Sequence, residues 1–213
     1  GAALARIHES GSLQMVDTSW IALSMAKMTM MVNGYESVPV HPLNYPLPLE
    51  AFKIVAIILP KGRKLIRRWL VETWYTLQQG GELFLAGAKE EGIQSVIRDA
   101  ESLFGNATVL AYRKGCRVAR MVKKVEDEEL RASSLPNLKT TRNSARPPAW
   151  TAEAGIARGS WIEFTATACG ETFALRNLPG VFSASQVDAG TALLLQHLSC
   201  EWVDGKRVLD FGC

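Results

Sequence analysis

The chain of 213 residues has few cysteines, few histidines and no long apolar run. Its four cysteines lie far apart and form no C-x-x-C pair, which argues against a zinc site or a disulfide framework and indicates reduced thiols in a cytoplasmic protein. The longest purely apolar stretch, residues 54–59, is far too short to cross a membrane, and the N-terminus has no signal-peptide pattern. The three histidines have no partner at ligand spacing, so we assign no metal ligand.

What is present is the composition of an ordinary globular protein. Hydrophobic residues make up 47% and charged residues 21%, which excludes a disordered chain and allows a sizeable core. The net charge of +3 permits an RNA partner without arguing for one. The chain opens on Gly-Ala-Ala without an initiator methionine and ends where a strand enters a glycine turn. We therefore expect a fragment truncated at both ends.

Strands and helices are predicted to alternate along residues 1–123. Residues 52–59 are apolar without alternation, which is typical of a central parallel strand. The other predicted strands are 13–16, a short one within 35–50, 83–86, and a hairpin of 108–112 and 117–122; the predicted helices are 3–10, 22–32, 65 to Gly80-Gly81, and 93–104. This order predicts an α/β fold with a parallel sheet, right-handed crossovers and an antiparallel hairpin at the edge.

A second domain is predicted to begin near residue 159. Residues 124–158 are first charged and then polar with prolines, as in a linker. Next come a hairpin of 161–167 and 172–175, a helix over 188–198 and a strand over 207–209. The predicted organisation is thus a first domain (1–123), a linker (124–158) and the N-terminal part of a second domain (159–213).

Residues 208–213 (V-L-D-F-G-C) are the most informative segment. An apolar strand that ends in an acid and a small-residue turn suits a nucleotide-type cofactor, because a missing Cβ lets backbone N–H groups approach the ligand. A plain strand followed by a tight turn is the alternative.

This segment resembles the opening of motif I in class I S-adenosylmethionine (SAM) dependent methyltransferases. Together with 178–183 (L-P-G-V-F-S) and 188–195 (D-A-G-T-A-L-L-L), it resembles the tandem-domain bacterial ribosomal RNA guanine-N2 methyltransferases of the methyltransferase small domain type. The resemblance implies a Rossmann-like fold and a SAM pocket lined by Phe182, Ser183, Asp188, Asp210 and Gly212. For Phe182, simple core packing is an equal alternative.

The first domain resembles a degenerate copy of the same fold. Residues 13–19 (L-Q-M-V-D-T-S) resemble its second strand, whose terminal acid, here Asp17, holds the ribose hydroxyls of SAM; a helix N-cap is the alternative. The first strand is lacking, since the chain begins at what resembles the following glycine loop. Where the family carries N-P-P-[FY] to hold the target amine, residues 59–62 are L-P-K-G. The resemblance therefore implies no methylating centre here, and we assign no catalytic residue.

The chain also offers a basic helix start that could contact RNA phosphates, with a solvated helix face as the alternative. Its members are Lys61, Arg63, Lys64, Arg67 and Arg68. The resemblance predicts a cytoplasmic, SAM-dependent methyltransferase that acts on the exocyclic N2 of a guanine in ribosomal RNA, with this fragment alone inactive. The alternative is a non-catalytic, methyltransferase-like RNA-binding or interaction module. A nicotinamide-dependent Rossmann enzyme would leave 178–183 and 188–195 unexplained.

Overall fold

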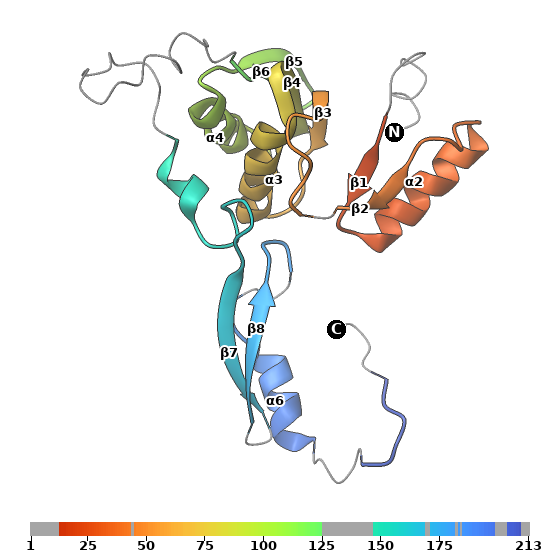
Figure 1. Ribbon diagram of the computed structural model, residues 1–213, viewed down its shortest axis with the longest axis vertical. Helices are drawn as coiled ribbons and strands as arrows, with labels where there is room; N and C mark the ends of the chain where they lie inside the picture. Colours follow the sequence, from red (N-terminus) through yellow and green to blue (C-terminus); the bar gives the residue numbers. More distant parts are fainter. Residues whose placement is uncertain are drawn as a thin grey trace. The chain divides into compact units, whose positions relative to one another are not determined.

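The computed structural model describes residues 13–43, 45–124, 147–168, 171–181, 183, 185–198 and 204–209. The chain divides into two compact units, Gly1–Pro46 and Leu47–Cys213 (Figure 1). Within these described ranges, no helix is both long and apolar enough to span a membrane.

The first unit is a small β-α-β arrangement. Strand β1 (Met15–Asp17) pairs in parallel with β2 (Val40–Pro42), and helix α2 (Trp20–Val32) connects them. Ser19 caps the start of α2, because its hydroxyl oxygen accepts a hydrogen bond from the backbone N–H of Ala22 at 3.3 Å. The strand, helix and short strand predicted over residues 13–50 are confirmed, while the helix predicted over 3–10 lies outside the described residues.

The second unit contains a four-stranded mixed sheet in the order β3-β4-β6-β5. Strands β3 (Phe52–Ile58) and β4 (Leu77–Ala88) are parallel and joined through helix α3 (Arg63–Thr76), as a crossover requires. Helix α4 (Ile93–Phe104) leads to the antiparallel hairpin of β5 (Thr108–Arg113) and β6 (Cys116–Val122), and β6 also pairs with β4. The predicted α/β architecture with an antiparallel edge hairpin is confirmed.

One face of this sheet packs against α3 and α4. The side chains at the centre of this core are all less than 3% exposed: Ile66, Leu70, Leu77, Leu83, Leu85, Ile93, Ala100, Phe104, Ala119 and Met121. The rings of Trp74 and Phe104 meet edge to face at 5.1 Å between centroids, which joins α3 to α4. Because so many of its apolar side chains are buried in this core, α3 is held rigidly. Several residues of the candidate site lie on α3.

The predicted boundary between α3 and β4 is wrong. The helix ends at Thr76 rather than at Gly80-Gly81, and the strand begins at once with Leu77. The pairing jumps from Phe52 opposite Leu77 to Ile54 opposite Glu82, so the two glycines lie in an irregular stretch of the strand. A Cβ on Gly81 would lie 2.8 Å from the carbonyl oxygen of Gln78, so the chain can bend this sharply only with glycine there.

The prediction of a central position for residues 52–59 is also not met in the described part of the chain. There β3 pairs only with β4 and forms an edge of the sheet. Two of its isoleucines, Ile54 and Ile58, are 59% and 80% exposed. An apolar run predicts burial on both faces of a strand, but it does not show which neighbouring strand covers its edge.

After residue 147 the chain packs against α3 and then forms a hairpin. The 3-10 helix η1 (Ala149–Ala152) buries Trp150, and Ile156 is fully enclosed, so this part of the predicted linker is held in place. Strands β7 (Ile162–Ala168) and β8 (Glu171–Asn177) are antiparallel, and α6 (Ala189–His197) follows. The predicted hairpin and helix are confirmed.

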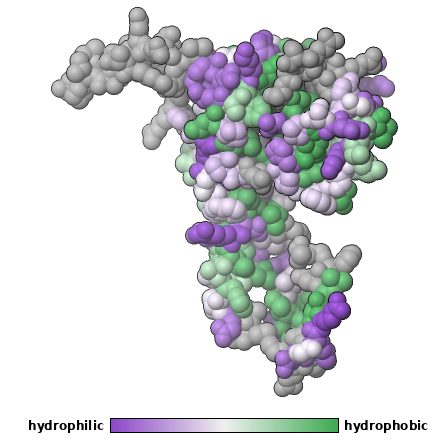
Figure 2. Space-filling model, turned by 45° about the vertical axis from the view of Figure 1, so that its right-hand side comes forward, coloured by the Kyte–Doolittle hydropathy of each residue, from purple (hydrophilic) through white to green (hydrophobic). Residues whose placement is uncertain are grey.

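The hairpin and α6 expose apolar side chains, seen as green atoms in the lower part of Figure 2. Phe173 and Leu175 on β8 and Leu193 and Leu194 on α6 are each between 37% and 61% exposed. A surface of this kind indicates a region that another element or partner covers. The strand predicted over 207–209 is not formed, because no described strand pairs with these residues.

Candidate functional site

A tight turn between β8 and α6 contains the segment predicted to line the cofactor. The backbone N–H of Val181 donates to the carbonyl oxygen of Leu178 at 3.3 Å, which closes the turn. Ser183 has a φ of +51°, a left-handed conformation that is uncommon and strained for a residue with a Cβ. Its half-buried hydroxyl has no hydrogen-bond partner among the described residues, so it remains available to a polar ligand.

Asp188 begins α6 and caps its N-terminus. Its Oδ1 accepts hydrogen bonds from the backbone N–H groups of Gly190 (2.9 Å) and Thr191 (3.1 Å), and its Oδ2 accepts one from the Thr191 hydroxyl (2.6 Å). The bond from that hydroxyl, followed by the bonds from the backbone, lowers the pKa of Asp188. The carboxylate therefore stays ionised and holds the first turn of the helix rigid.

Asp17 lies at the carboxyl end of β1, where the resemblance places an acid. Its Oδ1 accepts a hydrogen bond from the backbone N–H of Ser19 at 2.7 Å, while Ser19 itself is the N-cap of α2. The alternative in which Asp17 is the N-cap is thus wrong by two residues. Its Oδ2 accepts no hydrogen bond from the part of the chain that the structure describes.

The structure places Ser183 and Asp188 on one continuous turn-and-helix segment. Phe182, Asp210 and Gly212, which the resemblance also assigns to the cofactor, lie outside the described residues. Among the residues that are described, no group of three or more His, Cys, Asp or Glu side chains could hold a metal ion.

The resemblance places Leu59 where the family carries its amine-binding asparagine. Its side chain is 8% exposed and packs against Gly87, since a Cβ on Gly87 would lie 3.0 Å from the Cβ of Leu59. Pro60 and Lys61 follow, and Gly62 then begins α3 with a φ of +100°. This turn presents a packed leucine instead of a carboxamide, so it lacks the side-chain oxygen with which an asparagine would accept a hydrogen bond from a target amine.

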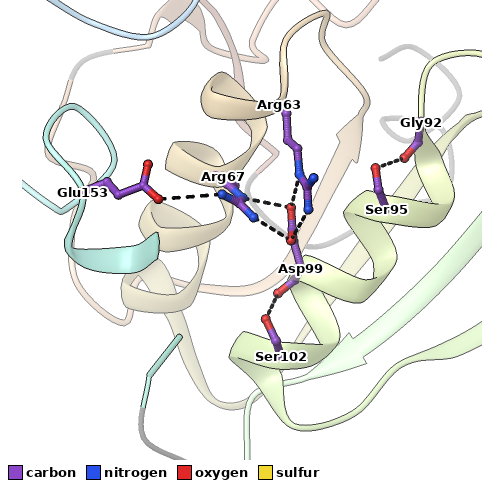
Figure 3. Close-up of polar contacts among 7 residues, drawn as sticks. All are labelled: Arg63, Arg67, Gly92, Ser95, Asp99, Ser102 and Glu153. Carbon is purple, nitrogen blue, oxygen red and sulfur yellow. Dashed lines mark hydrogen bonds and ion pairs between the residues drawn. The ribbon is translucent and has the colours of Figure 1, made fainter. Parts of the chain in front are cut away.

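Two arginines of the basic start of α3 form ion pairs with acidic side chains (Figure 3). Arg63 and Arg67 each donate two hydrogen bonds to the carboxylate of Asp99 on α4, all between 2.9 and 3.0 Å. Arg67 also lies 3.9 Å from Glu153 and stacks over the ring of Trp150 at 5.0 Å. Burial of Asp99 on its own would raise its pKa, but the hydrogen bonds from Arg63 and Arg67 outweigh this and lower it.

Arg68 cannot contact RNA, which corrects the prediction for this residue. Its side chain is 1% exposed, and its Nη1 donates to the carbonyl oxygens of Gly155 (2.8 Å) and Ser160 (3.0 Å). The apolar stripe of Leu65 and Trp69 does not predict this burial. Sequence periodicity cannot show that residues 87 positions away cover the part of α3 that carries Arg68.

Lys61 and Lys64 are exposed and form no ion pair with any described residue. Arg113 and Lys114 are also exposed, and they lie at the same end of the strands as Lys61 and Lys64. Strands β3 and β4 are parallel and both finish at this end, and Ala88, the last residue of β4, pairs with Cys116 just after the turn of the β5–β6 hairpin. We refer to Lys61, Lys64, Arg113 and Lys114 as the basic edge. The hairpin half of the basic edge was not predicted, although the sequence shows an arginine and a lysine directly before Gly115.

Comparison with known proteins finds methyltransferases. Residues 172–213 match the family model described as methyltransferase small domain. Ribosomal RNA small subunit methyltransferase C of Stutzerimonas stutzeri (strain A1501) is 31% identical over 195 residues, which cover 92% of this chain and 48% of that protein. The protein of the same name from Pseudomonas putida (strain W619) is 30% identical over 167 residues, or 78% of this chain and 42% of the relative.

A solved structure, the T. thermophilus 16S rRNA N2 G1207 methyltransferase (RsmC) in complex with AdoMet and guanosine, superimposes with a TM-score of 0.58 at 25% identity and covers 91% of this chain and 50% of that one. The predicted class I methyltransferase fold and the predicted family resemblance are thereby confirmed. The chain spans about half the length of these methyltransferase relatives.

Proposed function

We propose that the chain is part of a SAM-dependent methyltransferase that methylates the exocyclic N2 of a guanine in ribosomal RNA. The match of residues 172–213 to the methyltransferase small domain carries the proposal, and the relatives named above support the choice of substrate. The protein would act in the cytoplasm, where ribosomal RNA is found. By the same argument this chain supplies one wall of the cofactor site and not a complete active site.

The described residues of the second domain fit a polar cofactor. Ser183 offers a free hydroxyl on a strained turn, and Asp188 fixes the helix that follows. We assign SAM to Phe182, Ser183, Asp188, Asp210 and Gly212, with Asp188 acting through the start of α6. When bound, SAM supplies the methyl group that the guanine amine attacks. The protein's own part is orientation and exclusion of water, and no covalent enzyme intermediate is needed.

The first domain has a supporting role in this proposal. Its turn at residues 59–62 carries buried Leu59 in place of an amine-binding asparagine, so it cannot hold the target guanine. Asp17 remains its one candidate contact to a SAM ribose, through the oxygen that Ser19 leaves free. The alternative function, a non-catalytic RNA-binding module, is favoured by this same turn.

We assign contact with RNA phosphates to the basic edge and to Arg63. Lys61, Lys64 and Arg63 come from the predicted set; the Arg63 side chain is 55% exposed even while it binds Asp99. Arg67 is 19% exposed and held between Asp99 and Glu153, so its contribution is to position Asp99 and Trp150. Positive charge at a sheet edge attracts the RNA backbone without reading its sequence.

The test uses the complete product of the gene with SAM labelled in its methyl group and purified ribosomal RNA. We expect label in N2-methylguanosine after digestion to nucleosides and mass spectrometry. Asp210→Ala should abolish SAM binding and methylation, whereas Asp204→Ala, an exposed acid in the nearby turn, should change neither. Label in another nucleoside would refute the substrate, and RNA binding without SAM binding would favour the non-catalytic module.

A further inference from the structure

Helix α3 touches the predicted cofactor turn directly. Gly180 has a φ of +99° and lies against Leu65, so that a Cβ on Gly180 would be 2.9 Å from Cδ2 of Leu65 and 3.3 Å from its Cδ1. A contact shorter than 3.0 Å forces one of the two groups to shift, and a side chain at position 180 is also strained by the positive φ, so glycine lets the backbone lie on Leu65 without displacement or strain. Leu65 is 8% exposed and belongs to a helix fixed by the core of the first domain.

A second set of contacts, through Gly155, holds the same turn. Buried Pro179 packs on Gly155, since a Cβ there would lie 3.1 Å from Cδ of Pro179 and 2.7 Å from Cγ1 of Ile162. Gly155 is itself fixed, because its carbonyl oxygen accepts a hydrogen bond from buried Arg68 of α3. Both residues of the turn are therefore held by α3: Gly180 contacts Leu65 directly, and Pro179 is held through Gly155, which Arg68 binds.

Taken together, these contacts lead from α3 to the strained residue Ser183, three positions beyond Gly180. We propose that Leu65 is a positioning residue for the cofactor site. By supporting Gly180, its side chain sets the conformation of residues 179–181 and of Ser183, and thereby the affinity for SAM. This inference rests on the proposed function, since it assumes that residues 182 and 183 contact the cofactor. It gives the first domain, which has no amine-binding group of its own, a defined part in cofactor binding.

The central experiment is a double-mutant cycle in the complete gene product. Gly180→Ala should raise the Kd for SAM about tenfold, because the new methyl group displaces the turn from Leu65. Leu65→Ala should raise it by a smaller factor, because the turn loses its support. In the double variant the alanine methyl occupies the space that the leucine vacates, so the Kd should rise by clearly less than the product of the two single effects, and the rise that remains reflects the strain of an alanine at a φ of +99°.

Two controls separate positioning from general destabilisation. Gly159→Ala places a methyl group at a similarly positive φ of +75° with nothing within 4 Å, and it should leave the Kd for SAM unchanged. Val71→Ala removes core volume from the same helix, so it should lower the melting temperature without changing the Kd. If Val71→Ala raises the Kd as much as Leu65→Ala does, the role of Leu65 is merely structural and the proposal is overturned.

Hydrogen exchange gives a readout that does not depend on SAM. The amide of Val181 should exchange about tenfold faster in Leu65→Ala than in the wild type, and at the wild-type rate in Val71→Ala. Faster exchange in a protein that binds no SAM would refute the proposed function but keep the contact between α3 and the turn. Unchanged exchange and unchanged Kd in Leu65→Ala, in a protein that does bind SAM, would refute the positioning role alone.

Discussion

Arg68 in α3 donates a hydrogen bond to the carbonyl oxygen of Gly155, 87 residues further along the chain, at 2.8 Å. A guanidinium buried to 1% exposure needs such acceptors, because an unpaired buried charge costs several kcal/mol. The same Nη1 atom also donates a hydrogen bond to the carbonyl oxygen of Ser160. One side chain thus fastens residues 155–160, and with them the beginning of the β7–β8 hairpin, to helix α3.

Arg68→Ala should therefore destabilise the protein by about 2–4 kcal/mol, since two charge-assisted hydrogen bonds and the packing of the side-chain stem are lost together. Urea denaturation followed by circular dichroism measures this loss. Arg98→Ala provides the control, because Arg98 is an exposed arginine on α4 and its removal should change stability by less than about 0.5 kcal/mol. Equal effects of the two substitutions would show that the bonds to Gly155 and Ser160 contribute nothing.

The ion pairs of Asp99 predict a dependence of stability on pH. Because the pKa of Asp99 is lowered in the folded protein, the stabilisation is present in full above the unfolded pKa, about 3.9, and is lost as the pH falls below it toward the folded pKa. At pH 7, Asp99→Asn should cost about 1–3 kcal/mol, since Arg63 and Arg67 lose their carboxylate.

At pH 3 the same substitution should cost clearly less, because part of the wild-type stabilisation has already been lost. Unfolding curves of both proteins at pH 7, 5 and 3 measure the change. Glu101→Gln, which removes an exposed carboxylate on α4, serves as the control and should show no such trend. A cost of Asp99→Asn that stays constant across this range would contradict the ion-pair explanation.

Local pattern predicted most elements of the fold, and long-range contacts account for the errors. The stripe of α4 and the hairpin at Gly115 follow from neighbours in the sequence, and both were predicted correctly. The glycines at 80 and 81 look like a helix end, but tertiary pairing of Leu77 with Phe52 draws them into a strand. Likewise, nothing near Arg68 in the sequence shows that it is buried, because its acceptors are far away along the chain.

Asp188 allows a test of how an acid at the start of α6 serves the cofactor site. Asp188→Ala removes the cap and should lower both the stability of the protein and its affinity for SAM, because the first turn of α6 frays. Asp188→Ser keeps a capping oxygen without the charge. We expect the serine variant to have a stability close to that of the wild type and a Kd for SAM within about threefold of the wild-type value, both measured by calorimetry. A loss of affinity in the serine variant without a loss of stability would instead indicate direct contact between the carboxylate and SAM.

The basic edge predicts how RNA binding responds to salt. Each phosphate contact to single-stranded RNA adds about 0.7 to the slope of log K against log salt concentration. Lys61→Ala combined with Lys64→Ala should therefore reduce that slope by about 1.4 and weaken binding on the order of tenfold at low salt. The matched control removes the same charge elsewhere, with Lys27→Ala and Lys53→Ala, both exposed and outside the basic edge.

Filter binding of ribosomal RNA fragments at several salt concentrations gives both slopes. Because a phosphate contact does not read bases, the preference among RNA sequences should stay the same in the basic-edge variant, and an equal loss in both variants would mean that only net charge matters.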